Sequence, residues 1–124
     1  MTDHSVKLLL VEDEAMLRLI AVEMLQEAGF AVHEAADGVE ALEQLGAHPD
    51  VALLLTDVQM PRMGGYELVD KALALRPDLK ILLMTGYTQT APTEDLLKRG
   101  VQILYKPFNL ELLCSMARRM SAAS

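Results

Sequence analysis

The sequence predicts an α/β fold in which a five-stranded parallel sheet is covered by helices on both faces. Five short apolar runs alternate with segments whose apolar residues recur at helical spacing. The connections between these segments are short, which favours right-handed crossovers. The 124 residues suffice for one buried core but not for a second domain of comparable size. We therefore expect residues 1–124 to form a single doubly wound domain.

The first strand and helix are separated by an acidic loop. Val6–Val11 is apolar and stops at Glu12–Glu14, as expected of a buried strand that empties into solvent. Gly29 and Phe30 predict the end of the following helix. The predicted apolar face of that helix consists of Leu17, Ile20, Ala21, Met24, Leu25 and Ala28.

The second strand, Ala31–Ala35, has mixed character and is best placed at a sheet edge. Asp37 then predicts a helix N-cap, with Glu40 as its reciprocal partner. The short helix that follows is expected to carry Leu42 and Leu45 inward.

The third strand, Val51–Thr56, is an apolar run that ends abruptly on Asp57. An ionised side chain after such a run is expected where a buried strand reaches solvent. A third helix is predicted over Tyr66–Leu75, closed before Pro77. Three residues between the strand and the helix break regular structure: Pro61, Gly64 and Gly65.

The remaining elements are a fourth strand over Leu79–Met84, a short helix over Ala91–Arg99 and a fifth strand over Val101–Tyr105. Asn109 predicts the N-cap of a last helix. The residues expected to share the apolar face of that helix are Leu110, Leu113, Cys114 and Ala117.

The composition excludes several classes of function. A net charge of −7 argues against binding nucleic acid by phosphate neutralisation. The one cysteine, Cys114, excludes an internal disulfide and fits a reducing compartment. The N-terminal residues lack the pattern of a signal peptide, and no apolar run reaches membrane-spanning length. We expect a cytoplasmic protein without direct contact to nucleic acid or membrane.

Chemically competent side chains follow the strands at their carboxyl ends: Glu12 and Asp13, then Asp57, Thr85 and Lys106. In a parallel sheet these ends converge on one edge. Close carboxylates repel one another by roughly several kcal/mol per pair at an effective dielectric near 20, so they need a cation, and hard oxygen ligands suit Mg²⁺. Lys106 and the Thr85 hydroxyl suit phosphoryl oxygens. The pattern predicts phosphoryl transfer onto a carboxylate.

These motifs, in this order and spacing, resemble the two-component response-regulator receiver domain over essentially the whole chain. The resemblance implies a flavodoxin-like strand order 2-1-3-4-5. It also implies a phosphoacceptor signalling domain rather than a conventional enzyme. Such a domain catalyses its own Mg²⁺-dependent phosphorylation, and the donor is the phosphohistidine of a histidine kinase or of a phosphotransfer protein. The residues that carry the resemblance are Glu12, Asp13, Asp57, Met60, Pro61, Gly64, Thr85, Lys106, Pro107 and Phe108.

The resemblance implies roles for the acidic residues. Asp13 and Asp57 would ligate Mg²⁺ together with the backbone carbonyl of Gln59, and Glu12 would assist. Asp57 would accept the phosphoryl group. Gln59 and Tyr87, two residues beyond Asp57 and the threonine, would flank the path of an attacking water and set the phosphoryl lifetime.

The resemblance also implies a switch. Thr85 would swing toward the phosphoryl group, and Lys106, held by a cis peptide bond to Pro107, would pair with it. The family often has an aromatic residue three positions before the lysine, where this chain has Ile103. Tyr105 shares the strand face of Ile103 by period two and is the candidate replacement. A downstream protein would bind the face formed by the fourth helix, fifth strand and fifth helix.

Other functions remain as alternatives. An aspartyl-nucleophile phosphatase or hydrolase commonly needs a second carboxylate near the first, which the residues after Asp57 do not offer. A nucleotide or flavin binder would need a Gly-rich loop after the first strand. A receiver used as an unphosphorylated scaffold would be expected to have lost a site residue. His4, His33 and His48 share no metal-binding spacing. The chain termini favour a complete regulator over a segment of a longer protein.

Overall fold

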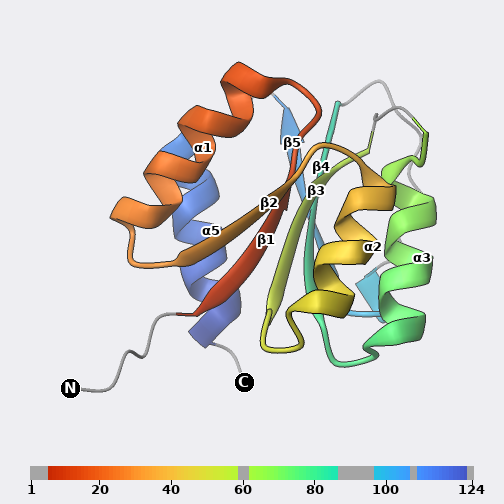
Figure 1. Cartoon of the computed structure of the whole chain (residues 1–124). Helices are drawn as coiled ribbons and strands as arrows, with labels where there is room; N and C mark the ends of the chain where they lie inside the picture. The colour runs from red at the N-terminus through yellow and green to blue at the C-terminus, as the bar shows by residue number, and fades with distance from the viewer. Residues whose placement is uncertain (1–5, 59–61, 87–96, 107–108, 123–124) are drawn as a thin grey trace.

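Five parallel strands form one sheet in the order β2-β1-β3-β4-β5. The computed structural model describes residues 6–58, 62–86, 97–106 and 109–122. Helices α1 and α5 cover one face of the sheet, and α2 and α3 cover the other (Figure 1). The predicted fold class and strand order are confirmed. The elements are β1 (Lys7–Val11), α1 (Ala15–Glu27), β2 (Ala31–Ala35), α2 (Gly38–Ala47), β3 (Leu53–Asp57), α3 (Gly65–Leu75), β4 (Lys80–Gly86), β5 (Val101–Lys106) and α5 (Leu110–Ala122).

The sheet separates two apolar cores. Alternate residues of each strand point to opposite faces, so Leu54 and Leu83 pack beneath α2 and α3, whereas Leu55 and Leu82 pack beneath α1 and α5. All five residues of the central strand β3 are buried. Burial on both faces explains why this strand is an uninterrupted apolar run in the sequence. It also explains why the mixed segment Ala31–Ala35 lies at the edge, as predicted.

The buried face of α1 differs from the predicted one. Ala21 and Leu25 are buried as expected, but Leu17 and Ile20 are 49% and 43% exposed. The first turns of α1 border an open, mostly apolar hollow of about 440 Å³ between this helix and the start of α5. Helical spacing identified an apolar surface correctly, but half of that surface faces the hollow instead of the core.

The predicted helix caps are present. The Asp37 carboxylate accepts a hydrogen bond from the backbone N–H of Glu40 at 2.9 Å, and the Glu40 carboxylate accepts one from the residue before Asp37 at 3.3 Å. Asn109 accepts from the backbone N–H of Leu112 at 2.7 Å. Gly29 has a φ of +103°, the left-handed conformation that ends a helix without a steric penalty.

The last strands are longer than predicted. β4 continues through Thr85 to Gly86, and β5 includes Lys106. Both functional candidates therefore sit on regular strand backbone, which fixes their position relative to Asp57. The predicted helix over Ala91–Arg99 lies mostly outside the described residues; residues 97 and 98 are helical. Among the helices that the structure describes, none combines the length and the apolar character needed to cross a membrane.

Candidate functional site

Asp57 and Lys106 form an ion pair at the carboxyl end of the sheet. The Lys106 ammonium donates a hydrogen bond to the Asp57 carboxylate across the intervening strand β4. The Asp57 side chain is only 8% exposed, whereas that of Lys106 is 41% exposed. The site is therefore a buried anion covered by a half-exposed cation, on the face shared with α1 and α5.

Thr85 lies at the same edge but on the opposite face. It is fully buried and stands two residues beyond Leu83, whose side chain packs beneath α2 and α3. Ile103 packs against that same core, and Tyr105, paired in register with Thr85, is exposed. The structure thus brings Asp57 and Lys106 into contact and places Thr85 on the far side of the strand ends.

Glu12 shows that negative charge accumulates at this edge. Its backbone N–H donates to the carbonyl of Ala35 at 3.1 Å, which holds it beside the sheet. Burial raises the pKa of the Glu12 carboxyl; the Glu14 backbone N–H opposes this, while the Asp13 side chain and the Asp57 charge raise it further. Burial and the neighbouring acids thus make the charged form of Glu12 less favourable than it is in water.

The described residues contain no group of three His, Cys, Asp or Glu side chains that could hold a metal ion unaided. Asp13 is exposed, and Asp57 is engaged by Lys106. This arrangement still fits Mg²⁺, which keeps several waters and takes one or two carboxylates plus a phosphate. The proximity of the acidic side chains of Glu12, Asp13 and Asp57 is the observation that favours a cation here.

Arg18, which we did not predict, binds the backbone of the acidic loop after β1. Its guanidinium donates to the backbone carbonyl of Glu12 at 2.7 Å and to the Glu34 carboxylate at 3.1 Å. A long polar side chain four residues into a helix is ordinarily solvated, and a bond to a backbone carbonyl leaves no sequence signature. The only signal was a basic residue on the otherwise apolar first turns of α1.

Replacing Arg18 with alanine should lower the free energy of unfolding by about 1.5 kcal/mol, because a charge-assisted, half-buried hydrogen bond is lost. Glu34→Gln removes only the exposed ion pair and should cost less than about 0.5 kcal/mol. Urea titration of both variants separates the two contacts. Equal effects would mean that the bond to Glu12 contributes nothing.

The loop after Asp57 is attached to its surroundings at both ends of its described part. Arg62, in the left-handed conformation at φ +68°, donates from Nε to the Asp37 carboxylate at 2.8 Å. Gly65 donates its N–H to the carbonyl of Val58 at 2.8 Å. A Cβ on Gly65 would lie 2.4 Å from the Asp57 carbonyl oxygen, so α3 starts directly against the backbone of the candidate acceptor.

Three predicted site residues, Gln59, Tyr87 and Pro107, lie outside the described residues, as does most of the predicted fourth helix. Their roles in metal binding, phosphoryl lifetime, the cis peptide bond and the output surface stay predictions.

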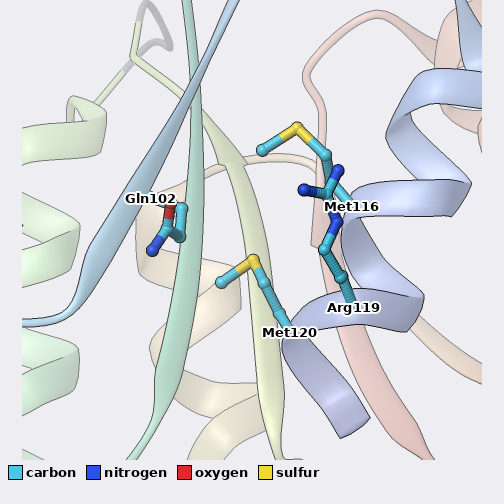
Figure 2. A pocket seen from close by; sticks show the side chains of 4 residues that line it. All are labelled: Gln102, Met116, Arg119 and Met120. Carbon is cyan, nitrogen blue, oxygen red and sulfur yellow. The ribbon is translucent and has the colours of Figure 1, made fainter. Parts of the chain in front are cut away.

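Two further features are separate from this edge. Gln102 faces Met116, Arg119 and Met120 across a hollow of about 280 Å³ between β5 and α5 (Figure 2). Gln102 precedes Lys106 by four residues, about 13 Å along a strand, so this hollow is not part of the site. The rings of His33 and His48 stack with centroids 3.8 Å apart, a contact between β2 and the residue that caps the end of α2, which their spacing in the sequence did not predict.

Comparison with known proteins identifies a family. The model of the response regulator receiver domain matches residues 8–118. The chain is 38% identical over 120 residues to the response regulator receiver protein CpdR of Brucella abortus, covering 95% of this chain and 98% of that protein. It is 40% identical over 122 residues to the sensor kinase CckA of the same organism, covering 94% of this chain but 12% of the kinase.

A solved structure agrees. The chemotaxis protein CheY4 of Vibrio cholerae superposes with a TM-score of 0.79 at 32% identity, covering 94% of this chain and 98% of that one. The match thus extends to a structure that the chain covers almost completely.

Proposed function

This chain belongs to the response regulator receiver family, the phosphoacceptor modules of two-component signalling, and we propose that Asp57 is its phosphoacceptor. The observation that carries the proposal is a buried carboxylate at the end of the central strand, paired with the ammonium of Lys106. A carboxylate this buried requires a charged or hydrogen-bonding partner, and Lys106 is that partner here.

The proposed reaction is transfer from a phosphohistidine. An Asp57 carboxylate oxygen attacks the phosphorus, the O–P bond forms as the P–N bond breaks, and the histidine nitrogen leaves with the electron pair. The Lys106 ammonium, already in contact with Asp57, then forms an ion pair with the phosphoryl oxygens. Thr85 donates its hydroxyl proton to a phosphoryl oxygen from the other side of the strand ends.

A divalent cation fits this edge. Glu12, Asp13 and Asp57, with the carbonyl of Gln59, would hold Mg²⁺. When bound, Mg²⁺ supplies positive charge that offsets the phosphoryl oxygens. The protein's own contribution is to bury Asp57 and to keep Glu12 near it, so that a bound cation would offset the repulsion between the two carboxylates.

The experiment is intact-mass measurement after incubation with acetyl phosphate and Mg²⁺. Wild type should gain one phosphoryl group that hydroxylamine removes, and Asp57→Asn should gain none. Asp50→Asn is the matched control, since Asp50 is an exposed acid paired with a lysine. Equal labelling of Asp57→Asn would contradict the proposal. Absence of labelling in wild type would favour the unphosphorylated scaffold instead.

The surface beside the site favours a protein as phosphoryl donor. The hollow next to Glu12 and Lys106 is lined mainly by apolar side chains of α1 and α5. The first turns of α1 add exposed apolar residues, among them Leu17 and Ile20. Contiguous exposed apolar surface commonly marks an interface. We infer that the protein that carries the phosphohistidine packs against α1.

Replacing Leu17 with serine should slow transfer from a phosphorylated histidine kinase roughly tenfold, because one apolar anchor of the interface is lost. Phosphorylation by acetyl phosphate should be unchanged, since the small donor needs no docking. Leu75→Ser is the control: Leu75 is 59% exposed, but on α3 across the sheet. Equal slowing with both donors would place the effect in the chemistry and not in docking.

A further inference from the structure

The phenol hydroxyl of Tyr66 is buried and, among the residues that the structure describes, has no hydrogen-bond partner. The Tyr66 ring packs against the core beneath α2 and α3. Buried tyrosine hydroxyls usually find a partner, because burial without one costs the lost bond to water. The resting protein therefore carries the cost of one buried hydroxyl without a hydrogen bond.

Tyr66 cannot withdraw from the site. It is the second residue of α3, and the residue before it, Gly65, is hydrogen-bonded to Val58 at 2.8 Å. The Asp57 carbonyl oxygen would be only 2.4 Å from a Cβ at Gly65, so the first turn of α3 is in close contact with the strand end. The backbone that positions Asp57 also positions Tyr66.

The neighbour of the Tyr66 hydroxyl is Thr85. Burial raises the pKa of Tyr66, and a hydrogen-bonding interaction with the Thr85 hydroxyl lowers it. The two hydroxyls nevertheless do not form a hydrogen bond in the resting protein, because the Tyr66 oxygen has no hydrogen-bond partner among the described residues. Ile103, which packs against the same core, carries no hydrogen-bonding side-chain atom. Thr85 and Tyr66 are thus adjacent hydroxyls on the face away from the Asp57–Lys106 pair.

We propose that Tyr66 is a positioning residue for Thr85, and that its hydroxyl donates a hydrogen bond to the Thr85 oxygen when Asp57 carries a phosphoryl group. This inference rests on the function proposed for Asp57. A threonine hydroxyl has one donor and two acceptor sites. Thr85 can therefore donate a hydrogen bond to a phosphoryl oxygen while its own oxygen accepts a hydrogen bond from the Tyr66 hydroxyl. The phosphorylated state satisfies the hydroxyl that the resting state leaves unpaired, and links the acceptor to α3.

Tyr66→Phe separates this role from packing, because the ring stays and only the hydroxyl goes. The resting protein should be at least as stable as wild type in urea, since an unpaired buried polar group is removed. The phosphorylated-like state loses one hydrogen bond. Its affinity for beryllium trifluoride, a phosphoryl mimic, should fall about three- to tenfold in the presence of Mg²⁺. If Tyr66 only packs, the affinity for beryllium trifluoride should stay at the wild-type value.

The experiment is calorimetric titration of beryllium trifluoride with Mg²⁺ into wild type, Tyr66→Phe, Thr85→Ala and the double variant. If the hydroxyls act together, Tyr66→Phe weakens binding in the wild-type background and adds no loss in the Thr85→Ala background. Wild-type affinity in Tyr66→Phe, or an undiminished loss in the double variant, would overturn the proposal.

Tyr105→Phe tests the rival hydroxyl, which is exposed on β5. A loss as large as that of Tyr66→Phe would also overturn the proposal. Phosphorylation of each variant by acetyl phosphate, read by intact mass, is measured in parallel. Wild type that neither binds the mimic nor takes up phosphoryl would overturn the function proposed for Asp57 itself. Wild type that does both, with Tyr66→Phe equal to it, removes only Tyr66.

Discussion

Replacing Gly65 with alanine is expected to destabilise the folded protein by about 3 kcal/mol, at the upper end of overpacking effects. The added Cβ would lie 2.4 Å from the Asp57 carbonyl oxygen and 2.8 Å from the Val58 Cα. Both neighbours are backbone atoms of the central strand end, so no side chain can rotate to make room. Either α3 must move outward as a whole or the strand end must deform, and both changes disturb the acceptor.

The adjacent glycine is the matched control. Among the residues that the structure describes, a Cβ on Gly64 would meet only the Val58 carbonyl oxygen at 3.5 Å, an ordinary contact, and Gly64 has an unstrained φ of −72°. Gly64→Ala should therefore change the free energy of unfolding by less than about 0.5 kcal/mol. Urea titrations of the two variants, with acetyl phosphate labelling of each, test the contrast. Similar stabilities would mean that the close approach of α3 is not rigid.

This pair marks a limit of sequence reasoning. The sequence located a break after Asp57 at Pro61, Gly64 and Gly65, because glycine and proline interrupt regular structure by themselves. The resemblance named Gly64 and not Gly65, but it is Gly65 that has no room for a side chain. That distinction depends on how closely α3 approaches a carbonyl of β3, a tertiary distance without a local signature.

The strand ends could be predicted for the opposite reason. A run buried on both faces is continuously apolar, so the first charged residue after it, Asp57, marks the carboxyl end of the central strand. The caps at Asp37 and Asn109 are local, and the sequence identified both. The sequence did not identify Arg18 and Tyr66, because the groups beside them, a backbone carbonyl and a buried hydroxyl, belong to other segments of the chain. Periodicity could not tell which apolar residues of α1 face a hollow instead of the core.

Asp57→Asn is expected to abolish phosphorylation and yet to stabilise the resting protein by roughly 1 kcal/mol. Asp57 is the buried member of its ion pair and Lys106 the half-exposed one. Neutralising Asp57 removes a desolvated charge and its repulsion with Glu12, and leaves behind a lysine that water can solvate. Lys106→Met removes the half-exposed ammonium and leaves the buried carboxylate without that counter-charge, so it should destabilise the folded protein by about 3 kcal/mol.

Magnesium should stabilise wild type and Asp57→Asn to different extents. A cation that binds only the folded site stabilises wild type by about 1.4 kcal/mol at ten times its dissociation constant. Magnesium should stabilise Asp57→Asn less, because one carboxylate ligand is missing. The difference in free energy of unfolding between Asp57→Asn and wild type should therefore be smaller with magnesium than without it. Urea titrations of wild type, Asp57→Asn and Lys106→Met, each with magnesium and with chelator, measure all these changes. If Asp57 were a structural cap, its loss would instead cost about 1 kcal/mol, magnesium would matter little and the two substitutions would share a sign. Opposite signs are expected because the fold retains an unfavourable charge that the cation and the phosphoryl group require.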